Sequence, residues 1–439
     1  MPTPAITIDS INQPPGFFEL LGSPQLTACW WRQGEGLIGL GQVARLQASS
    51  AAAIQEWWRA WLKDQPVVQD PQLQGNSWAE PLAFISFPFR RGGVHEIVVP
   101  RQIWGSRGQQ CWLTSLPADQ PDPPTTAALP AGRQPAAASD DHCSVGPIDC
   151  PTPTTPGSAP EINRPIHYQP EGLGHEAWLQ AVRQAIQAIA EGRLEKVVLA
   201  RAESTDWPAQ LSAGAVVQQL ATLYPTTWTF AVAGLIGATP ELLVSLEHGR
   251  LSSRVLAGSI RPDGQATRRG QLLAQSAKDQ SEHRFAVASV AAALRPHAQT
   301  LTVPDQPAIL QLPNVIHLAS DLGGQALPGR SVLDLGEAIH PSAAVCGTPV
   351  GAALEFIDAS EQLDRGRYSG PVGWINQSGD GQIGLALRCG QINDATIRLF
   401  AGAGIVADSD PEGEWDETQA KLAAMKQALA AALDSQTDR

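Results

Sequence analysis

The sequence predicts an α+β fold in which mostly antiparallel β-sheet is packed against long helices. The first observation is TWTFAVAGLIG followed by ELLVSLEHGRLSSRVLAGSI, whose β-branched and aromatic content is typical of strands. Within it, His248-Gly249 predicts a tight turn between two antiparallel strands. The second observation is an alanine-rich pattern with a helical period from about Gln271 to Leu294 and from Asp416 to Leu433, which predicts long helices.

The first part of the chain has the same mixed character. AFISFPF (Ala83 to Phe89) and HEIVVPRQIW (His95 to Trp104) have the composition of strands, and AAIQEWWRAWL predicts an amphipathic or partly buried helix. No group of residues suited to catalysis is found here. We expect residues 1–115 to be an N-terminal part of the fold.

A proline-rich segment follows, from about Leu116 to Pro165. It contains 12 of the chain's 36 prolines, and proline blocks both helix continuation and the hydrogen bonds of a β-ladder. We expect residues 116–165 to be a flexible loop or linker that separates residues 1–115 from residues 166–439.

After this segment a helix leads into a strand. Apolar residues at helical spacing begin at Trp178 and end before Gly192, at the position that glycine favours after a helix. The strand EKVVLARA should place Lys196, Val198 and Ala200 on one face, because side chains alternate along a strand.

Length and composition exclude several classes of function. The 439 residues suffice for one large domain or two modest ones, and no apolar run is long enough to span a bilayer. The N-terminus has no features of a secretory signal, so we expect a cytoplasmic protein. A net charge of -13 argues against binding to nucleic acid or to anionic membranes. An anionic small substrate would need a local cluster of cationic side chains or a metal ion.

Carboxylates occur at helical spacing in both predicted long helices. Glu414, Glu417 and Lys421 should share one face of the last helix, and Asp279 and Glu282 should share a face of the earlier one. Oxygen ligands of this kind suit Mg²⁺ better than zinc or copper. For any single pair, however, solvated surface charges are the more common explanation.

The residues before the last helix predict an anion site. In LFAGAGIVADSDPEGEW, Gly402 and Gly404 would let a glycine turn approach a ligand closely, and Ser409 to Pro411 can start a helix whose N-terminus favours anions. Arg388, in LALRCG, would lie on a strand and grip a carboxylate with two parallel hydrogen bonds.

Taken in order, these motifs make the chain resemble the chorismate-utilising enzymes. The resemblance covers about Gly174 to Leu433 and rests on KVVLAR, TPELLVS, LAGSIRP, SAKDQSEH, NVIHLASDL, HPSAAVCGTP, DRGRYSGPVGW, LALRCG and FAGAGIVADSDPEGEWDETQAK. The family includes isochorismate synthases, salicylate synthases, and component I of anthranilate synthase and of aminodeoxychorismate synthase. It implies antiparallel sheets packed face to face with helices outside. Residues before the linker match only loosely.

The resemblance implies a Mg²⁺ ion and a set of substrate contacts. Glu282 and Glu417 would bind the metal directly, and Asp279 and Glu414 would support it through water. The metal would hold the ring carboxylate of chorismate. Arg388, Tyr368 and the backbone of Gly402, Ala403 and Gly404 would hold the enolpyruvyl carboxylate, with Lys421 close by. His317 would hydrogen-bond the ring portion of the substrate. Gly258, Ser259 and Ala344 would complete the substrate pocket.

Lys196 and Glu241 resemble the acid/base pair of isochorismate synthases. Lys196 would take a proton from the water that attacks C2, and Glu241 would protonate the hydroxyl that leaves C4. These roles need a neutral amine and a neutral carboxylic acid, the minor forms of both groups in water. Without the resemblance, a strand-edge lysine serving solubility and a helix-start carboxylate would be the preferred interpretations.

Four positions favour isochorismate synthase within the family. Ammonia-using relatives carry glutamine where Lys196 stands, and many aminodeoxychorismate synthases carry a nucleophilic lysine near Ala257. No glutaminase-like segment is found, so no glutaminase partner is expected. Salicylate synthases share Lys196 and Glu241 but tend to have threonine in place of Ala344, which makes them the nearest alternative. A non-catalytic chorismate-binding protein is a further alternative. We expect a monomer that serves menaquinone or phylloquinone synthesis.

Overall fold

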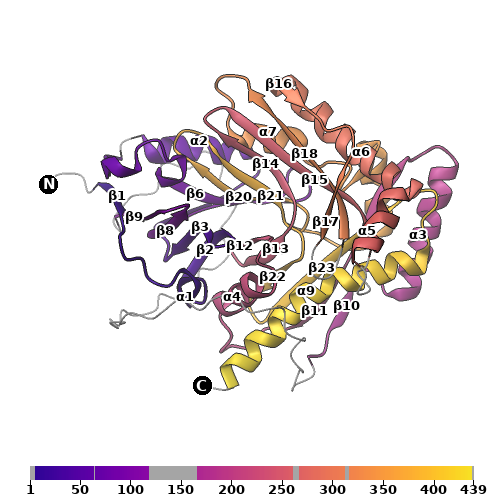
Figure 1. Ribbon diagram of the computed structural model, residues 1–439. Coiled ribbons are helices and arrows are strands. Elements are labelled where there is room, and N and C mark those ends of the chain that lie inside the picture. The colour runs from indigo at the N-terminus through magenta and orange to yellow at the C-terminus, as the bar shows by residue number, and fades with distance from the viewer. Residues whose placement is uncertain (1–4, 64, 118–165, 261–265, 312–315, 438–439) are drawn as a thin grey trace.

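The computed structural model describes residues 5–63, 65–117, 166–260, 266–311 and 316–437. These residues form two large β-sheets with helices outside them (Figure 1). Each strand pair in the described residues is antiparallel except β1 with β5. The predicted α+β fold is therefore confirmed. The predicted linker falls almost entirely on residues 118–165, which lie outside the described part.

The first sheet has 13 strands. In spatial order they are β10 (Gln169–Glu171), β11 (Lys196–Asp206), β23 (Thr396–Ile405), β22 (Cys389–Asn393), β13 (Leu235–Thr239), β12 (Trp228–Val232), β2 (Leu26–Arg32), β3 (Glu35–Leu40), β8 (Gln102–Arg107), β9 (Gln110–Ser115), β1 (Ile6–Ser10) and β5 (Val67–Gln69), with β19 (Gly347–Thr348) paired to β11.

The second sheet has 10 strands. In spatial order they are β16 (Ala298–Thr302), β18 (Ile316–Ala326), β15 (Arg250–Ile260), β14 (Leu242–Glu247), β21 (Gly381–Leu385), β20 (Pro371–Asn376), β6 (Leu82–Ser86), β7 (His95–Val99) and β4 (Ala44–Ala48), with β17 (Ala308–Gln311) paired to β18. Each sheet thus contains strands that precede the proline-rich segment and strands that follow it.

The two sheets face each other across one hydrophobic core. Trp30 and Phe230 of the first sheet pack in the same buried cluster as Phe84 and Trp374 of the second. The indole of Trp30 also donates a hydrogen bond to Gln382 of β21 across the core, at 2.8 Å. Burial of such large aromatic side chains is the main driving force that holds the layers together.

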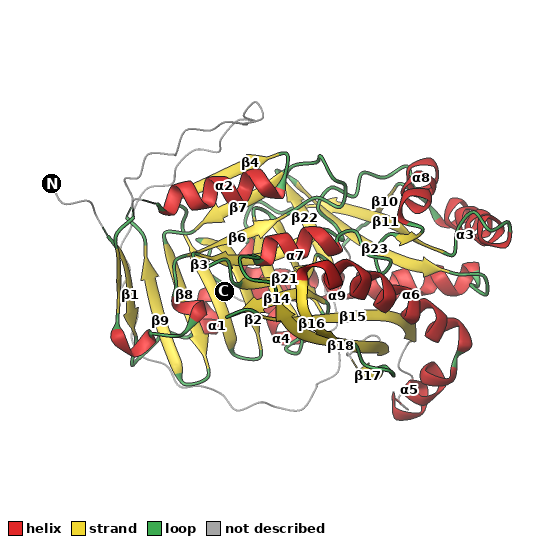
Figure 2. Ribbon diagram, turned by 90° about the horizontal axis from the view of Figure 1, so that it is seen from above, coloured by secondary structure: helices red, strands yellow, loops and turns green. Residues whose placement is uncertain are grey.

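Nine helices in the described residues complete the layers: α1 (Phe17–Leu21), α2 (Ala51–Leu62), α3 (His175–Ala190), α4 (Ala213–Leu223), α5 (Ala266–Gln275), α6 (Ala277–Leu294), α7 (Val332–Ile339), α8 (Val350–Ser360) and α9 (Pro411–Thr437). In Figure 1, α2, α6 and α7 lie above the sheets, and α1, α4 and α9 lie below. Viewed from above in Figure 2, α2, α6 and α7 lie across the strands. In the part of the chain that the structure describes, no helix is long and apolar enough to cross a membrane.

Local sequence explains most element boundaries. The strand β11 and the helices α2 and α3 lie where the sequence predicts them, and Gly192 after α3 has a φ of +73°. His248 and Gly249 form the predicted turn between β14 and β15, both with positive φ. The helix predicted from about Gln271 to Leu294 is instead two helices. Ser276 divides them, because its side chain accepts a hydrogen bond from the Asp279 amide and caps α6.

Candidate active site

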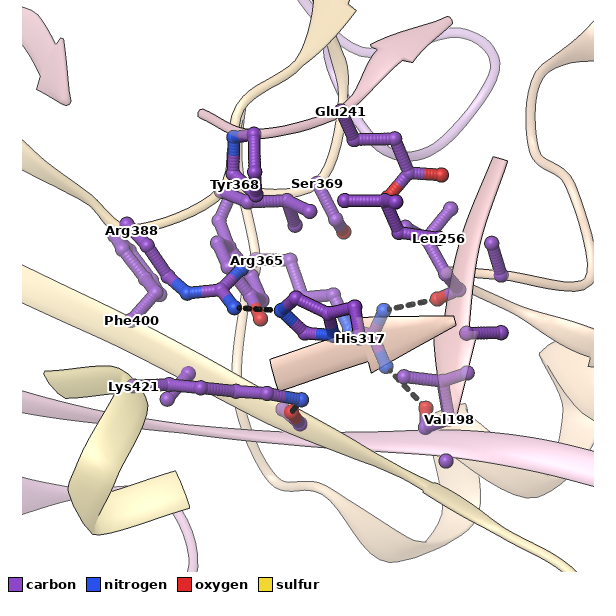
Figure 3. Close-up of a pocket in the computed structure, with 18 of the residues that line it drawn as sticks. Val198, Glu241, Leu256, His317, Arg365, Tyr368, Ser369, Arg388, Phe400 and Lys421 are labelled. Carbon is purple, nitrogen blue, oxygen red and sulfur yellow. Dashed lines mark hydrogen bonds between the residues drawn. The ribbon is translucent and has the colours of Figure 1, made fainter. Parts of the chain in front are cut away.

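A cavity lies between the two sheets and is lined by residues from distant parts of the chain (Figure 3). Nine of the predicted catalytic, substrate-binding and metal-binding residues line it: Glu241, Glu282, His317, Ala344, Tyr368, Arg388, Gly402, Gly404 and Lys421. Apolar side chains such as Val198, Leu256 and Phe400 form the rest of the wall. The cavity combines cationic, acidic and apolar surfaces, as sites for small charged ligands do.

Two of these residues lie where the chain crosses from one sheet to the other. Glu241 follows β13 of the first sheet and precedes β14 of the second, and Arg388 lies between β21 and β22 in the opposite direction. Arg388 has a φ of +45° and is not on a strand, so the prediction of a strand-borne arginine is wrong. Glu241 likewise does not start a helix. The two crossings direct both side chains into the space between the sheets.

Gly402 and Gly404 do not form a turn, contrary to the prediction. Both lie within β23, where they pair with Ala200 and Val198 of β11. A side chain at either position would collide with the site. A Cβ on Gly404 would lie 2.3 Å from Glu282 Oε1, and a Cβ on Gly402 would lie 3.1 Å from the Tyr368 hydroxyl. The glycines keep the strand surface clear for neighbouring polar groups.

Replacing Gly404 with alanine should therefore push Glu282 away from its position. Its new methyl group would also lie 3.0 Å from Lys196 Cε, so overpacking should cost about 1–3 kcal/mol of stability. Thermal unfolding would measure this loss. Gly323→Ala in β18 is the matched control, because a Cβ there meets no atom within 4 Å. Equal melting temperatures for the two variants would contradict the steric argument.

Arg388 and Lys421 form a cationic patch on one side of the cavity, and His317 lies beside Arg388 (Figure 3). The Arg388 guanidinium lies 2.8 Å from His317 Nε2. Burial, with the charges of Arg388 and Lys421, holds the pKa of His317 well below its usual value. His317 is therefore neutral, and its Nε2 accepts a hydrogen bond from Arg388. Lys421 donates to the Gly402 carbonyl at 2.8 Å.

Tyr368 stands beside this patch. Its ring stacks on Phe400 with centroids 5.1 Å apart. Burial raises the pKa of its phenol, so the hydroxyl keeps its proton and can donate a hydrogen bond to an anion.

Glu241 is held in its acid form at neutral pH. The side chain is almost completely buried, and burial raises its pKa to about 8 in spite of the nearby charges of Arg388 and Lys196. A carboxylic acid that is protonated at pH 7 can act as a general acid.

Lys196 is fully buried, which contradicts its interpretation as a surface lysine that serves solubility. Its Nζ lies 3.1 Å from Glu282 Oε1. Lys196 does not itself line the cavity, but its neighbours Glu282 and Gly404 do. A buried lysine in such a position is a candidate base.

Three of the four predicted metal-binding carboxylates are paired with lysines. Glu282 lies beside Lys196, Glu417 lies 2.5 Å from Lys421, and Glu414 lies 2.6 Å from Lys278. Ser409 also donates a hydrogen bond to Glu414, at 2.7 Å. Among the described residues, no three His, Cys, Asp or Glu side chains converge closely enough to hold a metal ion.

The carboxylates nevertheless fit a divalent cation in their chemistry. Burial and the adjacent charge of Glu417 raise the pKa of Glu414 to about 7. Burial, with a further contribution from Glu282, raises the pKa of Asp279. Crowded carboxylates of this kind would be relieved by a hard cation, which prefers oxygen ligands.

Three predicted substrate-binding residues, Gly258, Ser259 and Ala403, are not among the residues that line the cavity. Gly258 has a φ of +76°, and its N–H donates to Glu282 Oε2 at 3.1 Å, so it orients this carboxylate. Ala403 is buried in the core, and strand alternation puts its side chain on the face of β23 opposite Gly402 and Gly404. Ser259 lies opposite His317 in the β15–β18 pairing, and its side chain is outside the described part.

The sequence interpretation missed three charged residues of this region. Lys278 directly precedes Asp279 in SAKDQSEH, and Arg365 precedes Tyr368 by three residues in DRGRYSG. Glu361, which pairs with Arg365, lies just before the same motif. Their positions in or next to these motifs could have indicated a role in the site. Their interaction partners could not be predicted, because these depend on the fold.

Comparison with known proteins identifies the family. The model for the chorismate binding enzyme family matches residues 5–430. The isochorismate synthase DhbC of Bacillus subtilis is 38% identical in an alignment of 270 positions that covers 58% of this chain and 68% of that protein. The salicylate biosynthesis isochorismate synthase of Pseudomonas aeruginosa is 37% identical in an alignment of 261 positions that covers 58% of this chain and 55% of the relative.

Solved structures agree in fold. A 2,3-dihydroxybenzoate-specific isochorismate synthase, DhbC from Bacillus anthracis, superposes with a TM-score of 0.72 at 27% identity, over 94% of this chain and 99% of that one. The menaquinone-specific enzyme MenF of Escherichia coli, with a TM-score of 0.74 at 24% identity over 97% and 95% of the two chains, shares the fold. The ordered motifs, the cavity and the match over nearly the whole chain lead to one conclusion: this chain belongs to the family of chorismate-binding enzymes.

Proposed function

We propose that this chain is an isochorismate synthase, which adds water at C2 of chorismate and releases the hydroxyl from C4. The observation that carries the proposal is the state of Glu241. Burial raises its pKa to about 8, so it holds a proton at neutral pH in the cavity beside which Lys196 is buried. The relatives named isochorismate synthase support the same reaction.

In this proposal Lys196 and Glu241 move the two protons. Lys196 removes a proton from water as the oxygen bonds to C2, and the ring double bonds shift toward C4. Glu241 gives its proton to the departing C4 hydroxyl, which leaves as water. Glu241 starts in the form that its step needs, because a carboxylic acid that keeps its proton at neutral pH can protonate a leaving hydroxyl.

The cationic patch would hold the substrate. Arg388, Tyr368 and the backbone at Gly402 and Gly404 would bind the enolpyruvyl carboxylate, with Lys421 close by. The neutral imidazole of His317 would hydrogen-bond the ring portion. The apolar wall around Leu256 would exclude bulk water from the reacting ring.

Glu282 and Glu417 would hold Mg²⁺, with Asp279 and Glu414 supporting it through water. When bound, the ion supplies the positive charge that receives the ring carboxylate of chorismate. Glu282 and Glu417 now contact Lys196 and Lys421, so both carboxylates already lie beside the cavity that the substrate would enter.

Replacing Glu417 with glutamine should raise the Mg²⁺ concentration needed for half-maximal activity by more than about tenfold, since a ligand charge is lost. Mg²⁺ affinity measured by calorimetry on the resting protein would provide a readout that is independent of turnover. Glu412→Gln is the control, because Glu412 lies in the first turn of the same helix but pairs with His175 on the surface. An unchanged affinity in Glu417→Gln would remove this residue from the ligand set.

The alternative is a salicylate synthase, which forms isochorismate and then eliminates pyruvate in the same pocket. Ala344 lines the cavity, at a position where salicylate synthases tend to have threonine, and this favours isochorismate as the released product. The test is to incubate the pure protein with chorismate and Mg²⁺, with and without ammonium. Isochorismate alone supports the proposal, whereas salicylate with pyruvate supports the alternative. Amination that depends on ammonium would contradict both, and binding without turnover would indicate a non-catalytic protein.

We further propose that the isochorismate serves quinone synthesis. The names of similar proteins include a menaquinone-specific and a 2,3-dihydroxybenzoate-specific enzyme, so they support the quinone and the catecholate branches equally. Deleting the gene and measuring the menaquinone or phylloquinone pool decides between them. An unchanged quinone pool together with loss of a catecholate product would overturn the assignment.

A further inference from the structure

The strand that carries Lys196 is incompletely paired along one edge. Strand β11 pairs with β23 from Val197 to Asp206 on one side. On the other side, β19 pairs only with Lys196 and Val197, and β10 pairs only with residues 202–204. Within the described ranges, no strand lies against residues 198–201 on that edge. This gap is next to the cavity, which Val198 lines.

In this gap, the backbone N–H and C=O groups of β11 form hydrogen bonds with residues that are not in a neighbouring strand. The Val198 N–H donates to the Cys346 carbonyl at 2.7 Å, and the Val198 carbonyl accepts from Arg365 Nη2 at 2.7 Å. The Ala200 N–H donates to Glu361 Oε1 at 2.8 Å. Figure 3 shows Arg365, which also lines the cavity, reaching toward Val198. Two charged side chains therefore replace part of the missing strand.

Glu361 and Arg365 are themselves locked together. Arg365 Nε lies 2.8 Å from Glu361 Oε2, and a second contact joins Nη2 to Oε1. The two side chains are only 1% and 3% exposed, respectively. Phe89 packs on the guanidinium with its ring centroid 4.2 Å away. A buried, bidentate pair with all its partners in place has little freedom to move.

The same pair contacts two further parts of the cavity wall. Arg365 Nη1 donates to the Val345 carbonyl at 2.9 Å, next to Ala344. The Arg365 carbonyl accepts the Tyr368 N–H at 2.9 Å. The ion pair is thus bonded to the strand of the proposed base and to the loop at Ala344. Its contact with Tyr368 is through the Arg365 backbone and not through the charged groups.

We propose that the Glu361–Arg365 ion pair positions the active site by fixing the free edge of β11, so that Lys196 is held beside Glu282 at the wall of the cavity. Neither residue needs to touch the substrate for this role. Its effect on turnover rests on the proposed function, whereas its effect on the strand does not. A pair that only stabilised the fold would leave the turnover of the folded protein unchanged.

Arg365→Lys and Glu361→Gln test the proposal. Lysine keeps the charge but cannot donate to Glu361, Val198 and Val345 together, and glutamine keeps an acceptor for Ala200 but loses the charge. We expect kcat for chorismate to fall roughly 10- to 100-fold, since small misplacements have effects of this size. KM should stay within about threefold. Hydrogen exchange in a peptide spanning residues 196–202, measured without substrate, should rise roughly tenfold.

Arg45→Lys is the matched control. Arg45 also forms a bidentate pair, with Glu96, at 2.8 Å for both contacts, but it lies on β4 at the far edge of the second sheet. It should change neither kcat nor exchange in the 196–202 peptide by more than about twofold. All variants are compared at a temperature at which near-ultraviolet circular dichroism shows them fully folded.

Three results would overturn the proposal. Faster exchange with normal kcat would mean that the strand need not be fixed, and lower kcat with unchanged exchange would mean that Arg365 acts on the substrate directly. Failure of both variants to fold would make the pair a general folding determinant. If the unaltered protein makes no isochorismate, the proposed function fails, and the exchange comparison with Arg45→Lys still decides whether the pair holds the strand.

Discussion

Replacing Lys196 with alanine should lower kcat for chorismate conversion by roughly 10²- to 10⁴-fold, the usual effect of losing a general base. The change removes the only atom of this side chain that can accept a proton from water. The Mg²⁺ and substrate groups lie on other residues, so chorismate affinity should stay within about threefold. Steady-state kinetics and calorimetry with chorismate would measure the two effects separately.

Lys196→Gln and Lys426→Ala are the accompanying variants. Glutamine fills more of the buried space than alanine, so it guards against loss of activity through a cavity. It is also the residue of the ammonia-using relatives, and it should be equally inactive with water. Lys426 lies on α9, does not line the cavity and forms an ion pair with Glu203 at 2.5 Å. Loss of the Lys426 side chain should leave kcat unchanged. Near-full activity in either Lys196 variant would refute its assignment as the base.

Glu241→Gln should also lower kcat by roughly 10²- to 10⁴-fold, because an amide cannot donate the acid proton. In the unaltered protein, Glu241 has a pKa of about 8, so it is protonated below pH 8 and ionised above. The activity that depends on the acid form should therefore be full near neutral pH and fall about tenfold per pH unit above pH 8. A pH–rate profile of kcat from pH 6 to 10 would reveal this limb.

At high pH, Glu241→Gln should increase the stability of the protein although it lowers kcat. A carboxyl whose pKa is raised by folding binds its proton more tightly in the native state, so its contribution to stability is present below the unfolded pKa of 4.5. This contribution is lost as the pH rises toward 8, because the buried group must ionise. Glu241→Gln should thus melt higher than the unaltered protein at pH 9. A lower melting temperature at pH 9 would contradict the raised pKa.

The periodicity of the sequence was sufficient for the fold class. The patterns at α2 and α3 predict helices because each helix buries one face along most of its length. The strand β11 is buried on both faces from Lys196 to Glu203, so its composition was the better signal. The break at Ser276 could not be predicted from apolar spacing, since a single serine cap interrupts a helix without changing the pattern on either side. Gly402 and Gly404 were interpreted as a turn because glycine is common in turns, whereas here the strand needs them for clearance.

The ordered motifs also predicted most of the cavity wall, including the cationic Arg388 and Lys421 and the acidic Glu241 and Glu282. The structural setting of Arg388 was missed because the sequence around it alternates like a strand. Only the crossing of the chain between the sheets gives it a positive φ. The support from Glu361 and Arg365 was missed because its partners lie more than 100 residues away along the chain, at Val198 and Ala200.

The sequence by itself determined the fold class, the family and the chemical types available to the site. It could do so because periodicity and motif order are local properties that survive without coordinates. Only the tertiary structure decided which of those groups meet, which carboxylates pair with which lysines, and that Glu241 keeps its proton at neutral pH. The physical reason is that pairing and pKa depend on burial and on charges from distant segments, and the two chain crossings between the sheets bring those segments together.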